Sequence, residues 1–154
     1  MKEIKLTQNR YAIVDDEDFM ELCKYKWYFN GRYAARGKYS NGKSKNIFMH
    51  RVILNTPNGK ESDHINGDGL DNTRKNLRVC TRSQNLRNQN KSFSSKSGFK
   101  GVCFNKERGK WHARIWITGK NKHLGYFTEK TEAALSYNVA ARDCFGEFAS
   151  FNNI

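Results

Sequence analysis

A short polar segment in the middle of the chain holds the residues best suited to chemistry. Asp63 and His64 precede a loop with Gly67 and Gly69, and Asn85 comes 22 positions after Asp63. A carboxylate and a carboxamide are hard oxygen donors that suit Mg²⁺ or Mn²⁺, ions that keep their other sites for water or a phosphate oxygen. An imidazole beside such a ligand can accept a proton from an attacking water. The segment therefore predicts a site for metal-assisted hydrolysis.

The local fold has to bring these residues together. Thr81 and Gln84 form the T-x-x-Q pattern of a capping box, which predicts a helix that begins at Arg82. A strand with Asp63, a glycine-containing loop, a second strand and this helix would form a ββα unit. Such a unit can place Asp63 beside Asn85, which falls one turn into the helix.

Other acidic and amide residues have a simpler interpretation. Asp68, Asp71 and Asn72 are typical turn formers in a surface loop. The acidic run from Asp15 to Asp18 precedes apolar residues at helical spacing, so it indicates a helix N-terminus facing its own dipole rather than a metal site.

The polar segment resembles the His-Asn-His (HNH) ββα-metal endonuclease motif, in the variant whose third position is asparagine. The resemblance covers about residues 48 to 90 and rests on Asp63-His64, Asn76 and Asn85. It implies that His64 is the general base and that Asn76 braces the ββα turn at the catalytic centre. It also implies that Asp63 and Asn85 bind one divalent ion. The asparagine in the third position removes a nitrogen ligand, which favours Mg²⁺ or Mn²⁺ over Zn²⁺.

Three further residues are candidates for phosphate contact. His50 resembles the upstream histidine of phage and intron-encoded members, where it is either scaffold or a phosphate contact. Arg51 and Arg82 flank the motif and carry positive charge.

Charge points to a polyanionic partner. The chain has 154 residues, with 28 Lys+Arg against 15 Asp+Glu and a formal charge of +13. Residues 1–60 and 91–154 each carry a net +6, whereas residues 61–90 carry only +1. Basic groups gain affinity by releasing counterions from phosphates, so double-stranded DNA is the expected partner, with no small-molecule substrate. The start of the chain lacks the apolar core of a signal peptide, no run is long enough to span a bilayer, and no membrane partner is expected.

The first part of the chain predicts β-hairpins and one short helix. Asn30-Gly31 and Asn41-Gly42 each lie between strand-like residues. The Asn-Gly pair supplies the positive φ of a two-residue hairpin turn. Four cysteines lie far apart without a C-x-x-C pair, which indicates reduced thiols.

From Gly98 the pattern predicts three strands, near residues 102–105, 111–117 and 122–127, followed by a helix over about 129–145. Ala133, Tyr137, Ala140 and Cys144 recur at helical spacing as a stripe of mostly small residues. Such a stripe lets a helix lie close on a sheet.

The middle strand has two different faces. Strand periodicity turns Trp111, Ala113, Ile115 and Ile117 toward the helix and the alternate residues toward solvent. The outer face and its basic rim would contact DNA through Lys100, Asn105, Lys106, Arg108, His112, Arg114, Trp116 and His123. No further ligand stands at metal spacing near His112 and His123, so they are expected to be surface residues.

Residues 98 to 152 resemble the plant ethylene-response-factor (Apetala-type) DNA-binding domain. The matching segments are Gly98-Phe99-Lys100-Gly101-Val102, Gly109-Lys110-Trp111, His123-Leu124-Gly125-Tyr126-Phe127, Glu132-Ala133-Ala134, Tyr137, Ala140-Ala141, Gly146 and Phe151-Asn152. The resemblance implies a sheet that docks in the major groove. The base-reading positions differ, with Cys103, Asn105, Trp116 and His123 on the exposed face, so the sequence preference should differ too.

Together these observations predict an α+β protein with four parts. They are an N-terminal β-hairpin region that contacts DNA (1–47), an HNH unit (48–90), a linker (91–97) and an Apetala-type domain (98–154), in which a three-stranded antiparallel sheet packs on one helix. The expected activity is that of a homing-type DNA endonuclease that nicks one strand per monomer, as a monomer or weak homodimer in a phage or bacterial host cytoplasm. Two alternatives remain: a sequence-specific regulator with a silent HNH scaffold, and an RNA-binding module.

Overall fold

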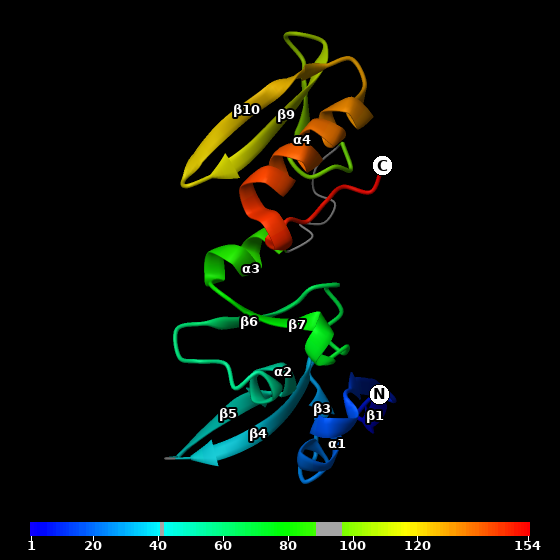
Figure 1. Cartoon of the computed structure of the whole chain (residues 1–154), viewed down its shortest axis with the longest axis vertical. Coiled ribbons are helices and arrows are strands. Elements are labelled where there is room, and N and C mark those ends of the chain that lie inside the picture. The colour runs from blue at the N-terminus through cyan, green and yellow to red at the C-terminus, as the bar shows by residue number, and fades with distance from the viewer. Residues whose placement is uncertain (41, 89–96) are drawn as a thin grey trace. The chain divides into compact units, whose positions relative to one another are not determined.

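The computed structural model describes residues 1–40, 42–88 and 97–154, and it divides into two compact units, Met1–Asn85 and Leu86–Ile154 (Figure 1). The predicted α+β class is confirmed, since small antiparallel sheets alternate with short helices. Within the described ranges, every helix is too short or too polar to cross a membrane. Most of the expected linker lies outside the described residues, so its bounds and those of the other parts stay predictions.

Two small sheets form most of the first unit. A two-stranded sheet pairs β1 with β2, and a three-stranded sheet has the order β3-β4-β5. Short helices follow β2 and β5. The bounds of these elements are β1 (Lys2–Lys5), β2 (Tyr11–Val14), α1 (Asp16–Leu22), β3 (Tyr28–Phe29), β4 (Ala34–Ser40), β5 (Lys43–Phe48) and α2 (Met49–Ile53).

The predicted ββα unit is confirmed in the next segment. β6 (Glu61–His64) pairs with β7 (Leu77–Cys80), a 3-10 turn η1 (Arg74–Asn76) leads into β7, and α3 (Arg82–Asn88) follows. The capping box at the start of α3 is also confirmed, because the Gln84 backbone N–H donates to Thr81 Oγ1 at 3.3 Å and Thr81 N–H donates to Gln84 Oε1 at 2.8 Å. The helix thus begins at the predicted residue.

One hydrophobic core serves both sheets and the ββα unit. Apolar side chains from the first hairpin, from α1 and α2 and from β7 pack together. Its buried members are Ile4, Leu6, Ala12, Val14, Leu22, Trp27, Ala34, Met49, Ile53 and Leu77. Leu77 lies next to the loop with the candidate catalytic residues, so packing of the N-terminal strands also fixes that loop.

The acidic run precedes a helix, as predicted, but its side chains bind elsewhere. Asp15 is the N-cap of α1 and makes no side-chain cap hydrogen bond. Its Oδ2 accepts the Arg74 backbone N–H at 2.7 Å, and Asp18 accepts Arg74 Nε at 2.9 Å and Nη2 at 2.7 Å. The acids therefore tie α1 to η1, a long-range role that helix-end chemistry does not reveal.

The hairpin turn predicted at Asn30-Gly31 is confirmed, but its predicted length of two residues is wrong. The ladder between β3 and β4 ends at Phe29 opposite Ala34, so residues 30–33 form the connection. Asn30 Oδ1 accepts the backbone N–H groups of Arg32 at 3.2 Å and Tyr33 at 2.8 Å. This side-chain turn holds a longer loop. The second predicted turn includes Asn41, which lies outside the described residues; Ser40 pairs with Lys43 on either side of it.

The second unit is the predicted sheet covered by a helix. Its antiparallel strands have the order β10-β9-β8, and α4 lies across one face (Figure 1). The bounds are β8 (Val102–Asn105), β9 (Lys110–Ile117), β10 (Lys120–Phe127), α4 (Lys130–Phe145) and the 3-10 turn η2 (Gly146–Phe148).

The helix packs closely because small residues face the sheet. Ala133, Ala134, Tyr137 and Ala141 are buried, whereas Cys144 is exposed, so the predicted stripe is wrong at its last position. Gly101 has a φ of 74°, and a Cβ there would lie 2.2 Å from the Tyr137 ring. Only glycine satisfies both the backbone angle and this close approach.

Candidate active site

His64 lies in an aromatic cage at the end of β6. Its side chain is 5% exposed, and its ring stacks on Tyr33 at 5.6 Å between centroids with an interplanar angle of 21°. His50 meets the same ring edge-on at 4.9 Å. These contacts fix the plane of the imidazole, so its nitrogens point in set directions.

Asn72 orients the ring further. His64 Nε2 lies 3.4 Å from Asn72 Oδ1, and Asn72 Nδ2 donates to the Leu70 carbonyl at 3.1 Å. Because that bond turns the amide oxygen toward the histidine, it favours the tautomer with the proton on Nε2. Asn72 is 0% exposed. The prediction of a surface turn residue is therefore wrong at this position.

The surroundings keep His64 neutral. Burial lowers the pKa of His64 below 6.5, and the hydrogen bond to Asn72 Oδ1 and the carboxylates of Asp63, Asp68 and Asp71 oppose that shift without cancelling it. A ring with a depressed pKa is uncharged at neutral pH. It can therefore accept a proton.

His50, at the start of α2, is also buried, and its pKa is lowered further than that of His64, because fewer groups oppose the shift. Burial, followed by the charges of His64 and Arg51, lowers the pKa of His50 to about 3. Its Nδ1 is buried and meets no hydrogen-bond partner within residues 1–40, 42–88 and 97–154. Its ring stacks on Phe48 at 5.5 Å. The residue thus supports the cage as a neutral ring.

The two expected metal ligands lie on the other face of β6 and each contacts a second side chain. Asp63 Oδ2 accepts Arg78 Nε at 2.9 Å and Nη2 at 2.8 Å, in a pair that is almost fully buried. Asn85 Nδ2 donates to Glu61 Oε2 at 2.7 Å. Glu61 is two residues before Asp63 on the same strand and so shares its face. Asn85 therefore contacts a carboxylate on the face of β6 that carries Asp63.

The donor types at this face fit a hard divalent ion. Two carboxylates and the amide oxygen of Asn85 are oxygen donors of the kind that Mg²⁺ and Mn²⁺ select. Within the described ranges no three His, Cys, Asp or Glu side chains form a closed metal cage. A site with few protein ligands, which leaves positions for water and phosphate, matches this composition.

Asn76 braces the loop between the two strands. Its Oδ1 accepts the Asn66 backbone N–H at 3.0 Å, and its Nδ2 donates to the Asp71 carbonyl at 2.8 Å. Its own carbonyl accepts the Ile65 N–H at 2.8 Å. All three bonds hold the loop that follows His64, which is a positioning task rather than a direct contact.

The first hairpin clamps the same loop. Ile13 of β2 forms a bridge to Asp71, donates its N–H to the Leu70 carbonyl at 2.9 Å and accepts the Asn72 N–H at 2.8 Å. The backbone on both sides of Asp71, up to Asn72, is therefore held by a strand almost sixty residues earlier in the chain.

The three residues expected to contact phosphate differ in their exposure and in their contacts. His50 is buried in the cage, and Arg51 donates from Nη1 to the Lys60 carbonyl at 3.1 Å. Arg82 is exposed as the first residue of α3.

The outer face of the second sheet carries the expected polar and aromatic residues. Trp116 is 61% exposed and Arg114 is exposed beside it on β9. His112 Nε2 lies 2.7 Å from His123 Nδ1, while Cys103 Sγ lies 3.8 Å from the other ring nitrogen of His112. Because His112 directs its nitrogens to opposite sides, these three side chains do not converge on one point.

The remaining expected contacts surround that face. Lys106 and Arg108 are exposed in the β8–β9 turn, and Asn105 Oδ1 accepts the Arg108 N–H at 2.9 Å. Lys100 donates from Nζ to the Arg87 carbonyl at 2.7 Å.

Comparison with known proteins agrees with the geometry of the ββα unit. Residues 48–87 match the HNH endonuclease family. The chain is 31% identical over 147 residues to an uncharacterized HNH endonuclease, L560, of Acanthamoeba polyphaga mimivirus, covering 94% of this chain and 75% of that protein. The chain belongs to the HNH endonuclease family. It is a DNA endonuclease, and HNH nucleases use a divalent metal ion.

Two other relatives share parts of the chain. Protein 3.8 of Escherichia phage T7 is 32% identical over 95 residues, covering 62% of this chain and 78% of its own length. The AP2-like ethylene-responsive transcription factor TOE2 of Arabidopsis thaliana is 28% identical over 120 residues. That match covers 77% of this chain but only 25% of the plant protein.

Sequence reasoning missed four residues of the site: Tyr33, Glu61, Asn72 and Arg78. Strand alternation could have found Glu61, since it stands two positions before Asp63. It could also have found Arg78, the cross-strand neighbour of Asp63 once the β6–β7 register is known. Tyr33 comes from another sheet, and no local pattern in the sequence indicates its contact with His64.

Proposed function

We propose that the protein hydrolyses a backbone phosphodiester of double-stranded DNA, with His64 as the general base. The observation that carries the proposal is a neutral, buried imidazole held by Tyr33 and Asn72, one residue from a carboxylate in a ββα unit. The hydrogen bond to Asn72 favours the proton on Nε2. Nδ1 then takes the proton from the attacking water.

One divalent ion, Mg²⁺ or Mn²⁺, would be held by Asp63 and Asn85, and when bound it would stabilise the charge that develops on the phosphate and leaving oxygens. Arg78 and Glu61 keep these two side chains in fixed positions through their hydrogen bonds. Asn76 keeps the following loop in place, so His64 and Asp63 retain their relative orientation.

The second unit would position the nuclease on DNA. We infer that the face of β8–β10 around Arg114 and Trp116 docks against the duplex, with Lys100, Asn105, Lys106, Arg108, His112 and His123 as further contacts. The match to a plant transcription factor supports an Apetala-type domain here. His50, Arg51 and Arg82 remain candidates for phosphate contact near the active site.

We infer that each monomer cuts one strand. The chain offers one His64 and one Asp63–Asn85 pair, which supports one nick per monomer and a monomer or weak homodimer. A homing role and action in the cytoplasm of an infected host cell are supported by relatives from a giant virus and a phage.

The test is incubation of the purified chain with supercoiled plasmid and Mg²⁺, beside the His64→Ala variant. We expect nicked circles from the wild type and a rate lower by about 10²–10⁴-fold in the variant, with DNA binding retained. An undiminished rate in the variant would show that another group is the base. A gel shift without cleavage by the wild type on its cognate DNA would favour a regulator with a silent HNH scaffold.

A further inference from the structure

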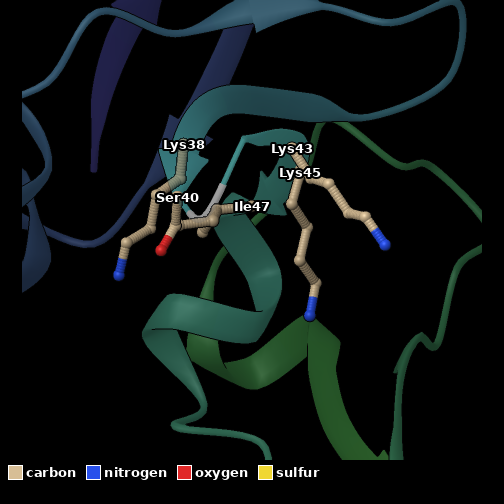
Figure 2. Close-up of a pocket in the computed structure, with 5 residues that line it drawn as sticks. All are labelled: Lys38, Ser40, Lys43, Lys45 and Ile47. Atoms are coloured by element: carbon tan, nitrogen blue, oxygen red, sulfur yellow. The ribbon is translucent and has the colours of Figure 1, made fainter.

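The hairpin of β4 and β5 carries an uncompensated row of positive charge. Residues 22–60 contain nine Lys or Arg and no Asp or Glu. Three of the lysines, Lys38, Lys43 and Lys45, line one recess with Ser40 and Ile47 (Figure 2). Within the described part of the chain, none of the three ammonium groups forms a hydrogen bond or an ion pair. We call this surface the lysine face.

Register places the lysines on the same face of the hairpin. Lys38 pairs with Lys45, and Ser40 pairs with Lys43. Directly opposed residues of an antiparallel pair share a face, and residues two apart on a strand lie about 6.8 Å from each other on that face. Figure 2 shows the three ammonium groups extending from the strands without converging, so they suit an extended anion better than a single small one.

This arrangement costs stability in the free protein. Opposed like charges in a sheet repel each other, and Lys38 opposite Lys45 is such a pair. A polyanion along the face would remove this repulsion. A row of phosphates has the needed repeat, since each DNA strand carries one charge per about 3.4 Å of helix axis.

The root of the hairpin is at the candidate active site. β4 follows Tyr33, which stacks on His64, and β5 leads through Phe48 into His50. A duplex held at His64 therefore has the hairpin within reach of its backbone.

We propose that the lysine face is an arm that contacts the phosphate backbone of DNA beside the cleavage site. The proposal rests on the proposed function, because it takes DNA as the substrate. An alternative use of the same lysines is protection, since β5 is an edge strand and charged edges prevent sheet-to-sheet pairing. β3 pairs only with Ala34 and Ala35, so β4 is open on its other side at Lys38, and the experiment below separates this use from DNA contact.

The experiment compares two triple variants of the full chain. The first replaces Lys38, Lys43 and Lys45 by Gln. The matched control replaces Lys5, Lys26 and Lys60 by Gln as well. These three lysines are exposed in the same unit, away from the hairpin. Both lose the same charge. Binding to a labelled DNA duplex is measured in EDTA over a series of salt concentrations, so that no cleavage interferes.

In the arm variant, the slope of log K against log salt should become less negative by about 2.7, because each phosphate contact contributes about −0.9. The control should change it by less than about 0.9. Equal slopes for both variants would overturn the arm. So would self-association of the arm variant with an unchanged slope, which would assign the lysines to edge protection. A slope change seen with single-stranded RNA but not with duplex DNA would overturn the choice of DNA.

Plasmid cleavage, measured separately with Mg²⁺, distinguishes the two proposals. A wild type that nicks DNA while the arm variant keeps the wild-type slope overturns the arm alone. If the wild type never nicks DNA, but the arm variant shows a less steep salt dependence of binding than the wild type, the hydrolytic function is overturned and the arm is supported.

Discussion

Burial controls the titration of His50, and this has a consequence for stability. The folded chain keeps this ring neutral down to a pKa of about 3, whereas the unfolded chain protonates it below 6.5. The unfolded state therefore binds more protons between these values. The free energy of unfolding should fall as the pH drops through that window, by about 1.4 kcal/mol per pH unit from this residue.

A comparison with His50→Phe isolates this effect. Phenylalanine keeps the ring that stacks on Phe48 but does not titrate. Urea unfolding from about pH 7 down to about pH 4 should show a shallower loss of stability in the variant. The shift of His64 has the same sign and is present in both proteins, so it leaves the difference unaffected. If the free energy of unfolding fell equally steeply with pH in both proteins, the lowered pKa of His50 would be contradicted.

The Asp63–Arg78 pair should be costly to break. The two side chains are 6% and 10% exposed. Arg78→Met removes the guanidinium and leaves the carboxylate buried, which should lower the free energy of unfolding by about 3 kcal/mol. The double variant Asp63→Asn/Arg78→Met should recover much of that loss in chemical denaturation. If Arg78→Met were as stable as the wild type, the Asp63 carboxylate would have to be hydrated in the variant.

At the residue scale, the sequence predicts the residues of the motif but not the residues that contact them. Asp63, His64 and Asn76 lie within one local unit, so their types and spacing predict where they stand in it. Tyr33 and the buried state of Asn72 depend on a sheet and a strand from elsewhere in the chain. Local propensity does not predict such long-range contacts. For Asn72 it predicts an exposed turn residue, whereas the side chain is buried.

At the scale of elements, the first turn of α3 controls Asn85. Its N–H donates to the Thr81 carbonyl at 3.0 Å, within the turn that the capping box holds. Thr81→Ala should destabilise that turn by about 1 kcal/mol. We expect faster amide exchange at Gln84 and Asn85 and a weaker apparent affinity for Mg²⁺ in cleavage.

The control is Thr81→Ser, which keeps a capping hydroxyl and should behave like the wild type. Loss of Mg²⁺ affinity in both variants would show that the methyl group of Thr81, rather than the cap, is needed.

Elements with strong local signals were the ones that sequence predicted well. The capping box gave the start of α3, and alternation gave the strand around Ala113 and Ile115 with its buried face. The two-residue length predicted for the turn at Asn30 was wrong because the asparagine side chain accepts two backbone N–H groups ahead of it and holds a longer loop. The Asn-Gly pair alone does not specify this register.

At the scale of the whole molecule, binding and chemistry should separate by unit. Arg114→Ala/Trp116→Ala changes exposed residues on the outer face of β9, far along the chain from His64. We expect KM for cognate duplex to rise with kcat nearly unchanged, while His64→Ala lowers kcat with KM nearly unchanged. Steady-state nicking over a range of DNA concentrations measures both. A fall in kcat alone for the double variant would contradict a docking role.

The clamp between Ile13 and the backbone around Asn72 has a consequence for transplanting the nuclease. A graft cut at residues 48–90 would contain His64, Asp63 and Asn85 yet omit the strand that seats Asn72. The imidazole would then lose its oriented partner even though every motif residue was present. The smallest portable cutting module therefore starts at the first hairpin, well upstream of the recognisable motif.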